Sequence, residues 1–471
     1  MDRPSVPCTE TENVCPRSSE KRQIKAQQAV RLGVDSSVAP PGRPPATLSN
    51  PTLLALASDE ELSELLSALR PLLRCCDSTG RWVVPAVADA LQPLQNTCQE
   101  RLSRVSQPCS VQLATAAAGF FAGVMREGGN GAVVQDGLLA AVAEYVLSGC
   151  SALEGSALAS LLALLLEARF QPAHPITFGN AVIKRVLQLS HAPPGMRLRH
   201  LADSVEALAQ LSCCDAASAP PVISVAVGVA LAVEAQHCEL DSEHLLQLAR
   251  VMQGVAVIAV TTPVCSSIVL AASAAWHLQV MRVSAAAQQQ AGLGTAISHM
   301  WCTSRLLAAA GQANAHDPHH SLLTGCLGLM GKAASADREA RGVPGPTSAQ
   351  RRVLSALCLL GVPAPLITVN CEFKELFQIS IAVRMSLQTG EGHRQVAILV
   401  RDPLKHLLRG SSVGAPLGAQ LAQERMLQAA GWTVCPLVSQ SCLQLPLDVL
   451  AAELAALMLG ERERSSLRFV A

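Results

Sequence analysis

The stretch from Arg394 to Leu445 constrains the fold most, because the chain changes its architecture there. The charge-free run Val396–Val400 is too short for a helix and is typical of a buried strand. An amphipathic helix is expected from about Pro416 to Ala430, with Gly431 at the position of a helix C-cap. Trp432–Val438 is predicted as a second strand. A strand, a crossover helix and a strand favour a parallel sheet that helices cover.

Further elements are predicted around this unit. Phe377–Val383 alternates apolar and polar residues, which indicates a strand. Ile367–Val369 is expected to be a short strand or an extended link, and Leu447–Leu459 a closing helix. The boundary of the unit lies at Val362–Pro365. We therefore expect a small α/β module of three strands or more at residues 366–460, followed by a charged tail at residues 461–471.

Two blocks of residues in this module form a family pattern. The first block is Val396, Ala397, Ile398, Val400, Pro403 and His406, and the second is Leu421, Arg425, Leu427, Gly431, Trp432 and Val434. The pattern resembles the RAP domain, a C-terminal module of organellar RNA-metabolism proteins. The resemblance implies a restriction-endonuclease-like fold, RNA as a partner and an organellar, here mitochondrial, location. It covers roughly a seventh to a fifth of the chain.

The chain departs from the family pattern at two positions that bear on catalysis. Leu399 stands where the family has Glu, and Arg401 stands where it has Asp. A nuclease of this fold needs carboxylates at the strand end to hold a divalent metal. Asp402 with Glu391 or Glu424 is an alternative ligand set, which would make the chain a metal-dependent nuclease. The hydrophobe and the arginine favour phosphate binding instead, so no catalytic residue, cofactor or metal site is predicted.

Basic and aromatic residues flank the first strand of this unit and the loop after it. Such side chains on a strand-end loop can meet phosphates, and an exposed tryptophan can stack on a base. The alternative is that the tryptophan is part of the core and the basic residues form a solvated rim. The RNA-binding residues that the resemblance favours are His393, Arg394, Arg401, Lys405, His406, Arg409 and Trp432.

The chain before the module is predicted to be helical. Ser58 is placed as the N-cap of a helix with acids in its first turn. Helix starts recur about every 20 residues, a period typical of helical-hairpin solenoids. We expect an α-helical repeat domain at residues 51–362. Its helices are predicted at residues 83–104, 110–126, 132–148, 155–169, 175–190, 197–212, 220–237, 241–257, 263–283, 287–310, 320–336 and 347–360.

Composition agrees with stacked helices and limits other interpretations. Half of the residues are hydrophobic and only 3% are aromatic, which disfavours a large β domain. The 36 basic and 36 acidic residues balance, so global charge gives no support for nucleic-acid binding. The 17 cysteines contain no Cys-x-x-Cys spacing, which indicates reduced thiols. The cluster from His316 to His320 is expected to open a helix and not to hold a metal.

Two segments bear on targeting. Residues 1–50 have no apolar periodicity and are expected to be disordered or extended, as a possible targeting region without a secretory signal. Val251–Met281 has no charged residue and is long enough to span a bilayer. Polar residues interrupt it, so two buried helices with a turn at Pro263 are predicted and no membrane span.

These observations together predict a non-catalytic RNA-binding protein. Its expected role is in mitochondrial gene expression, as an rRNA-associated component of the mitochondrial ribosome or as an RNA-stabilising or processing factor. The low basic content favours embedding among other proteins of a ribonucleoprotein complex. The alternative from another class is an α-solenoid protein–protein scaffold without RNA contact, which the neutral charge and the apolar helices would suit.

Overall fold

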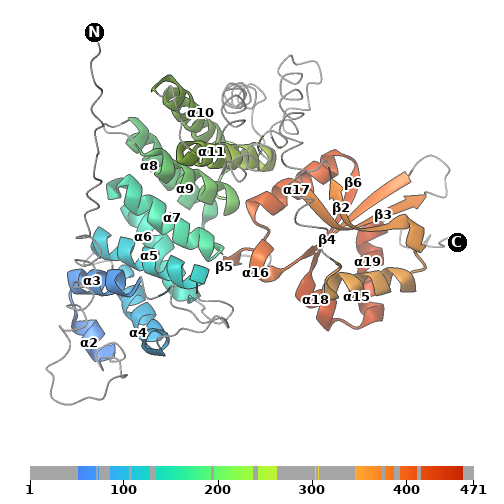
Figure 1. The fold of residues 1–471 in the computed structure, drawn as a ribbon, viewed down its shortest axis with the longest axis horizontal. Coiled ribbons are helices and arrows are strands. Elements are labelled where there is room, and N and C mark those ends of the chain that lie inside the picture. The colour runs from blue at the N-terminus through green and yellow to red at the C-terminus, as the bar shows by residue number, and fades with distance from the viewer. Residues whose placement is uncertain are drawn as a thin grey trace, which may run out of the picture. The chain divides into compact units, whose positions relative to one another are not determined.

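The structure is a computed structural model, and most of its described residues are helical. Figure 1 shows helices over most of the chain and a small C-terminal sheet, as predicted. The expected N-terminal segment, the helices at 263–283 and 320–336, most of the helix at 287–310 and the His316–His320 cluster lie outside the described residues. The structure describes residues 51–70, 73, 85–104, 109–127, 134–191, 196–236, 242–262, 303, 306, 345–373, 377–386, 393–410 and 415–459.

The first compact unit, which ends at residue 133, is helical where it is described. Ser58 caps its second helix through a reciprocal capping box with Glu61, so the predicted N-cap is confirmed. Arg101 pairs with Asp59 and donates to two backbone carbonyls before that helix. The helices of the unit are α2 (Pro51–Leu56), α3 (Asp59–Leu69), α4 (Pro85–Leu102) and α5 (Val111–Glu127).

The second unit begins at residue 134 with helices that pack in two layers. Within each layer a helix packs against the next helix but one along the chain. Their bounds lie within a few residues of the predicted helices. One layer holds α7 (Gly155–Glu167), α9 (Leu198–Gln210) and α11 (Ser242–Thr261), and the other holds α6 (Asp136–Gly149), α8 (Pro175–His191) and α10 (Ala219–Gln236).

One ion-pair network joins two helices of the first layer. Arg250 of α11 contacts Asp203 and Glu206 of α9 at 2.8 and 2.6 Å. Gly254 lies one turn further along α11, where an added Cβ would stand 2.8 Å from a methyl group of Val205. Charge pairing and a small residue therefore hold these two helices in close contact. None of the helices that the structure describes is long and apolar enough to cross a membrane.

The C-terminal sheet has four strands in the order β2-β3-β4-β6. β2 (Ile367–Phe373), β3 (Phe377–Ser386) and β4 (His393–Arg401) are antiparallel neighbours, and β6 (Trp432–Val438) runs parallel to β4. The crossover between β4 and β6 contains α17 (Gly418–Ala429). Its C-cap is Ala430, and Gly431 follows with a φ of 84°. The predicted parallel pair, crossover helix and C-cap glycine are therefore confirmed.

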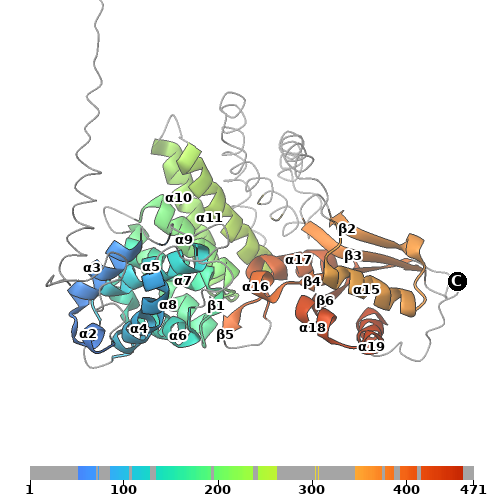
Figure 2. The same ribbon diagram turned by 60° about the horizontal axis from the view of Figure 1, so that its bottom comes forward.

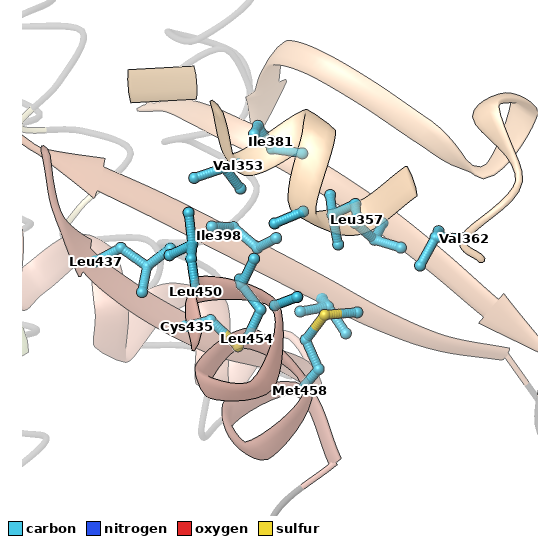
Figure 3. Packing of buried hydrophobic residues seen from close by; sticks show 14 of the residues in the cluster. Val353, Leu357, Val362, Ile381, Ile398, Cys435, Leu437, Leu450, Leu454 and Met458 are labelled. Carbon is cyan, nitrogen blue, oxygen red and sulfur yellow. The ribbon is translucent and has the colours of Figure 1, made fainter. Parts of the chain in front are cut away.

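Helices cover both faces of this sheet. Ile381, Ile398 and Cys435 lie side by side on neighbouring strands and are fully buried in the core. Figure 3 shows this core between the sheet and helices α15 (Ser348–Leu359) and α19 (Leu447–Leu459), and α18 (Ser439–Gln444) contributes Cys442. Side chains alternate along β4, so Ala397 and Leu399 face the opposite side, which α17 covers.

The position of α15 differs from the expected end of the helical region at residue 362. Val353 and Leu357 of α15 are buried in the core of the sheet. Thr347 caps the helix through a reciprocal pair with Gln350, whose amide also donates to Asn370 of β2 at 2.9 Å. α15 thus packs as part of the C-terminal module. The spacing of apolar residues could not reveal this, because it shows that a helix buries one face but not which element it packs against.

The module contacts the helices of its own unit through α17, which packs on α9 and α11, and through the chain between β4 and α17. β5 (Arg409–Gly410) pairs in parallel with β1 (Phe170–Gln171), which follows α7, and Figure 2 labels the two strands next to each other. The Ala419 amide donates to Gln210 of α9 at 3.1 Å. A Cβ on Gly418 would overlap the carbonyl oxygen of Ala209. We call these contacts the seam.

Gly418→Ala should therefore destabilise the protein. The added methyl group would overlap backbone atoms, which cannot move aside as a flexible side chain can, and overpacking of this kind costs about 1–3 kcal/mol. Gly228→Ala in α10 is the matched control, because nothing lies within 4 Å of its Cβ position. It should be neutral or stabilising by up to about 1 kcal/mol. Urea unfolding measures both, and equal stabilities for the two variants would contradict the seam.

Candidate functional site

The predicted RNA-binding residues lie at opposite ends of two parallel strands. His393 and Arg394 begin β4 and Trp432 begins β6, whereas Arg401 ends β4 and Lys405 follows it. Arg401 lies seven positions after Arg394 along an extended strand, which is about 23 Å at 3.3 Å per residue. The structure therefore divides the predicted set into two groups and does not bring it together as one surface.

The group at the start of the strands is built into the sheet. His393 lies opposite Ser386 in the register of β3 and β4. Arg394 is half-buried, and its Nε donates to the Thr433 hydroxyl at 2.9 Å. Trp432 is also half-buried and meets Phe373 edge to face, with ring centroids 6.1 Å apart. An edge-to-face ring pair is a favourable core contact.

Arg401, at the other end of β4, is 5% exposed. Its guanidinium forms an ion pair with Glu424 of α17 and donates to the Gln420 carbonyl at 3.4 Å. Arginine suits such a buried pair, because its planar group stays charged and can make several hydrogen bonds at once. The positive charge of Arg401 is thus neutralised by Glu424 inside the module.

Asp402 and His406 shape the turn that follows Arg401. The Asp402 carboxylate accepts from the Leu404 amide at 2.9 Å and so caps the short helix α16 (Pro403–His406). The Asp402 amide donates to Nδ1 of His406 at 3.0 Å. Burial lowers the pKa of His406, and the positive charges of Arg401, Arg169 and Lys405 lower it further, against the opposite effect of Asp402.

Lys405 and Arg409 have different environments. The Lys405 side chain is 72% exposed and lies 4.0 Å from Asp402, so it is available to solvent. Arg409 contacts Asp136 at the start of α6 at 2.5 Å and donates to the Val134 carbonyl at 3.3 Å. Its backbone amide donates to Arg169 at 2.7 Å. Arg409 is therefore a contact residue of the seam.

The acids of the alternative nuclease site are also engaged. Glu424 pairs with Arg401, and Asp402 caps α16. Glu391 lies outside the described residues. Within the described parts of the chain, no group of three or more His, Cys, Asp or Glu residues has the geometry to hold a metal ion.

Arg169 is the residue near this site that sequence reasoning did not select. It lies between α7 and β1, more than 200 positions before β4, and its charge acts on His406. Its φ of 51° places it in the left-handed region, which is uncommon for a residue with a side chain. No local pattern in the sequence predicts either feature, because both depend on the pairing of β1 with β5.

Comparison with known families gives no further identification. The chain matches no protein-family model, and a search of curated proteins finds no match to it.

Glu424→Gln should destabilise the protein strongly. The change leaves the Arg401 charge buried without its counter-ion, which costs on the order of 3 kcal/mol. Arg425→Gln alters the next side chain, which is exposed, and should change the free energy of unfolding by less than about 0.5 kcal/mol. Urea unfolding of both variants at neutral pH is the measurement. A Glu424→Gln protein as stable as the Arg425→Gln protein would rule out the buried pair.

The stability of the protein should depend on pH through His406. Its folded pKa is lowered, so below about pH 6.5 the unfolded chain binds a proton that the folded chain binds only at lower pH. Stability is therefore full at neutral pH and declines as the pH falls through that range. His406→Gln should weaken the decline while its amide oxygen keeps the Asp402 contact. Leu404→Ala, at an exposed site, should retain the decline in urea unfolding between pH 7.5 and 5.5. An equal decline in His406→Gln and Leu404→Ala would refute the assignment of the pH dependence to His406.

Proposed function

We propose that the chain is a non-catalytic RNA-binding protein of mitochondrial gene expression. Its C-terminal module would have a restriction-endonuclease-like fold and belong to the RAP family that its sequence resembles. The observation that carries the proposal is the Arg401–Glu424 pair at the end of β4. Where a nuclease of that fold would present carboxylates to a metal, this chain has a buried arginine that engages the neighbouring acid. Such an arrangement supports recognition and not hydrolysis.

Exposed cations near the crossover provide phosphate contacts. Lys405 on α16 and Arg425 on α17 are exposed, and Arg384 on β3 is exposed at the other end of the strands, opposite Gln395. Exposed lysines and arginines bind backbone phosphates without reading sequence. The equal numbers of acidic and basic residues predict weak binding on this basis alone. We therefore propose a protein that resides in a ribonucleoprotein complex, as an rRNA-associated component of the mitochondrial ribosome or as an RNA-stabilising or processing factor.

The helices before the module support a second part of the proposal. In α6 to α11, each helix packs with the next but one, so successive hairpins add to two continuous layers. This is the packing expected of a helical-hairpin solenoid, in which each pair buries its apolar face against its neighbours. We propose that these layers present RNA or protein partners with an extended surface, while the C-terminal module contacts phosphates.

A protein–protein scaffold is the second candidate, and one feature favours it. Leu443 of α18 and Val449 and Leu457 of α19 are exposed, although α19 already buries its other face in the core of the module. A helix that is apolar on both faces is typical of a buried position. A scaffold without RNA contact would use such a face for a protein partner.

Filter binding of the whole chain to single-stranded and double-stranded RNA across a salt series separates the candidates. The proposed function predicts binding at low salt that weakens as salt is added. The logarithm of the binding constant should fall linearly with the logarithm of the salt concentration, with a slope of about −0.7 per phosphate contact on single strands. The RNA should remain intact in Mg²⁺ or Mn²⁺. No binding at any salt concentration would support the scaffold. Cleavage that Asp402→Ala abolishes would instead identify a nuclease.

A further inference from the structure

The pairing of β5 with β1 brings Arg169 near the chain around His406, because the Arg169 carbonyl accepts a hydrogen bond from the Arg409 amide, three residues after His406. The charges that act on His406 belong to Arg169, which follows α7, and to Arg401, Asp402 and Lys405 of the module. Arg401 is neutralised by Glu424, which leaves two cations and one carboxylate around the imidazole. We call Arg169, Lys405 and His406 the seam cluster. It exists only where β5 pairs with β1.

The backbone of Arg169 is anchored at the seam. Its φ of 51° is left-handed, and an arginine pays a steric cost there that glycine would avoid. The same turn points the Arg169 carbonyl at the Arg409 amide, 2.7 Å away. The guanidinium is half-buried and makes no hydrogen bond or ion pair with any residue that the structure describes. Its five N–H donors are thus available to a ligand among those residues.

His406 adds a donor of defined orientation. Its Nδ1 accepts the Asp402 amide hydrogen, so the neutral ring carries its proton on Nε2. The ring is half-buried and fixed at the end of α16, because its backbone amide also bonds to the Asp402 carbonyl. The exposed Lys405 ammonium, one residue before it, is a mobile point charge.

We infer that Arg169, Lys405 and His406 together bind one backbone segment of single-stranded RNA through its phosphodiester groups. The assignment rests on the proposed function and adds a residue of the helical region to the site. Arginine offers two parallel donors to a phosphate, lysine adds charge and the imidazole adds a neutral N–H. The Asp402 carboxylate stays charged as the cap of α16 and offsets one of the two cations, which leaves one positive charge to attract the phosphate.

The test is filter binding of the full chain to a single-stranded oligouridylate across a salt series. Arg169→Gln and Lys405→Gln should each weaken binding by about fivefold to tenfold at low salt. Each should reduce the salt slope by about 0.7, and the double variant by about 1.4. Arg351→Gln is the control, since it removes one exposed charge from α15, which lies on the face of the sheet opposite to α17. It should bind as the wild type does.

Two further variants separate charge from folding. Arg169→Lys keeps the charge and should retain the wild-type salt slope. Arg169→Asn tolerates the left-handed backbone but should lose the contact. If thermal melting shows that Arg169→Asn unfolds, Lys405→Gln decides the question, because its exposed side chain does not support the fold.

The outcomes also separate this assignment from the function on which it rests. The wild type could bind RNA in a salt-dependent way while Lys405→Gln and a folded Arg169 variant bind equally well. That result would overturn the seam cluster and leave the proposed RNA binding intact. A wild-type chain that binds no oligouridylate or other RNA at low salt would overturn both.

Discussion

The backbone pairing of β5 with β1, beside the packing of α17 on α9 and α11, joins the C-terminal module to the helices of the second unit. It joins Arg409 to Phe170 in parallel register, across more than 200 residues of chain. Gly418 lets the first turn of α17 approach the end of α9 without a side chain between them. Backbone groups that leave water must be satisfied, so a paired strand end is a strong positional restraint. The seam and the packing of α17 on α11 together restrain where the module lies against the helices.

The seam also changes what the basic residues of the loop do. Arg409 forms an ion pair with Asp136 and supports β5, while Arg401 is buried in the module in an ion pair with Glu424. Two of the charges that a basic strand-end loop would present to RNA are thus used for packing. Lys405 stays exposed, and the charge of Arg169 acts on the neighbouring His406 from the helical side. The proposed RNA contact is consequently shared by both parts of the unit and does not belong to the loop alone.

The elements that the sequence predicts well are those that local patterns specify. β6 and α19 have their predicted bounds, and Gly431 adopts the left-handed conformation that a C-cap glycine allows. β4 is longer than the predicted run Val396–Val400, because polar residues at both ends also pair.

The grouping of site residues depends on tertiary contacts that no local pattern contains. Strand length alone would have placed Arg394 and Arg401 at opposite ends of β4. The burial of Arg401 depends on Glu424, one helix away, and the role of Arg169 depends on a two-residue strand that has no periodicity of its own. The packing of α15 on the sheet has the same origin, because it joins segments through a shared core. Such features require coordinates.

Hydrogen exchange at the seam tests the account most directly. The Arg409 amide bonds to the Arg169 carbonyl, and the Ala419 amide bonds to Gln210. If the seam exists in solution, both amides should be protected and should exchange together with the amides of α9, in one cooperative opening. Rapid exchange of Arg409 and Ala419 while α9 stays protected would show that the module is not held against the helices, and would contradict the account.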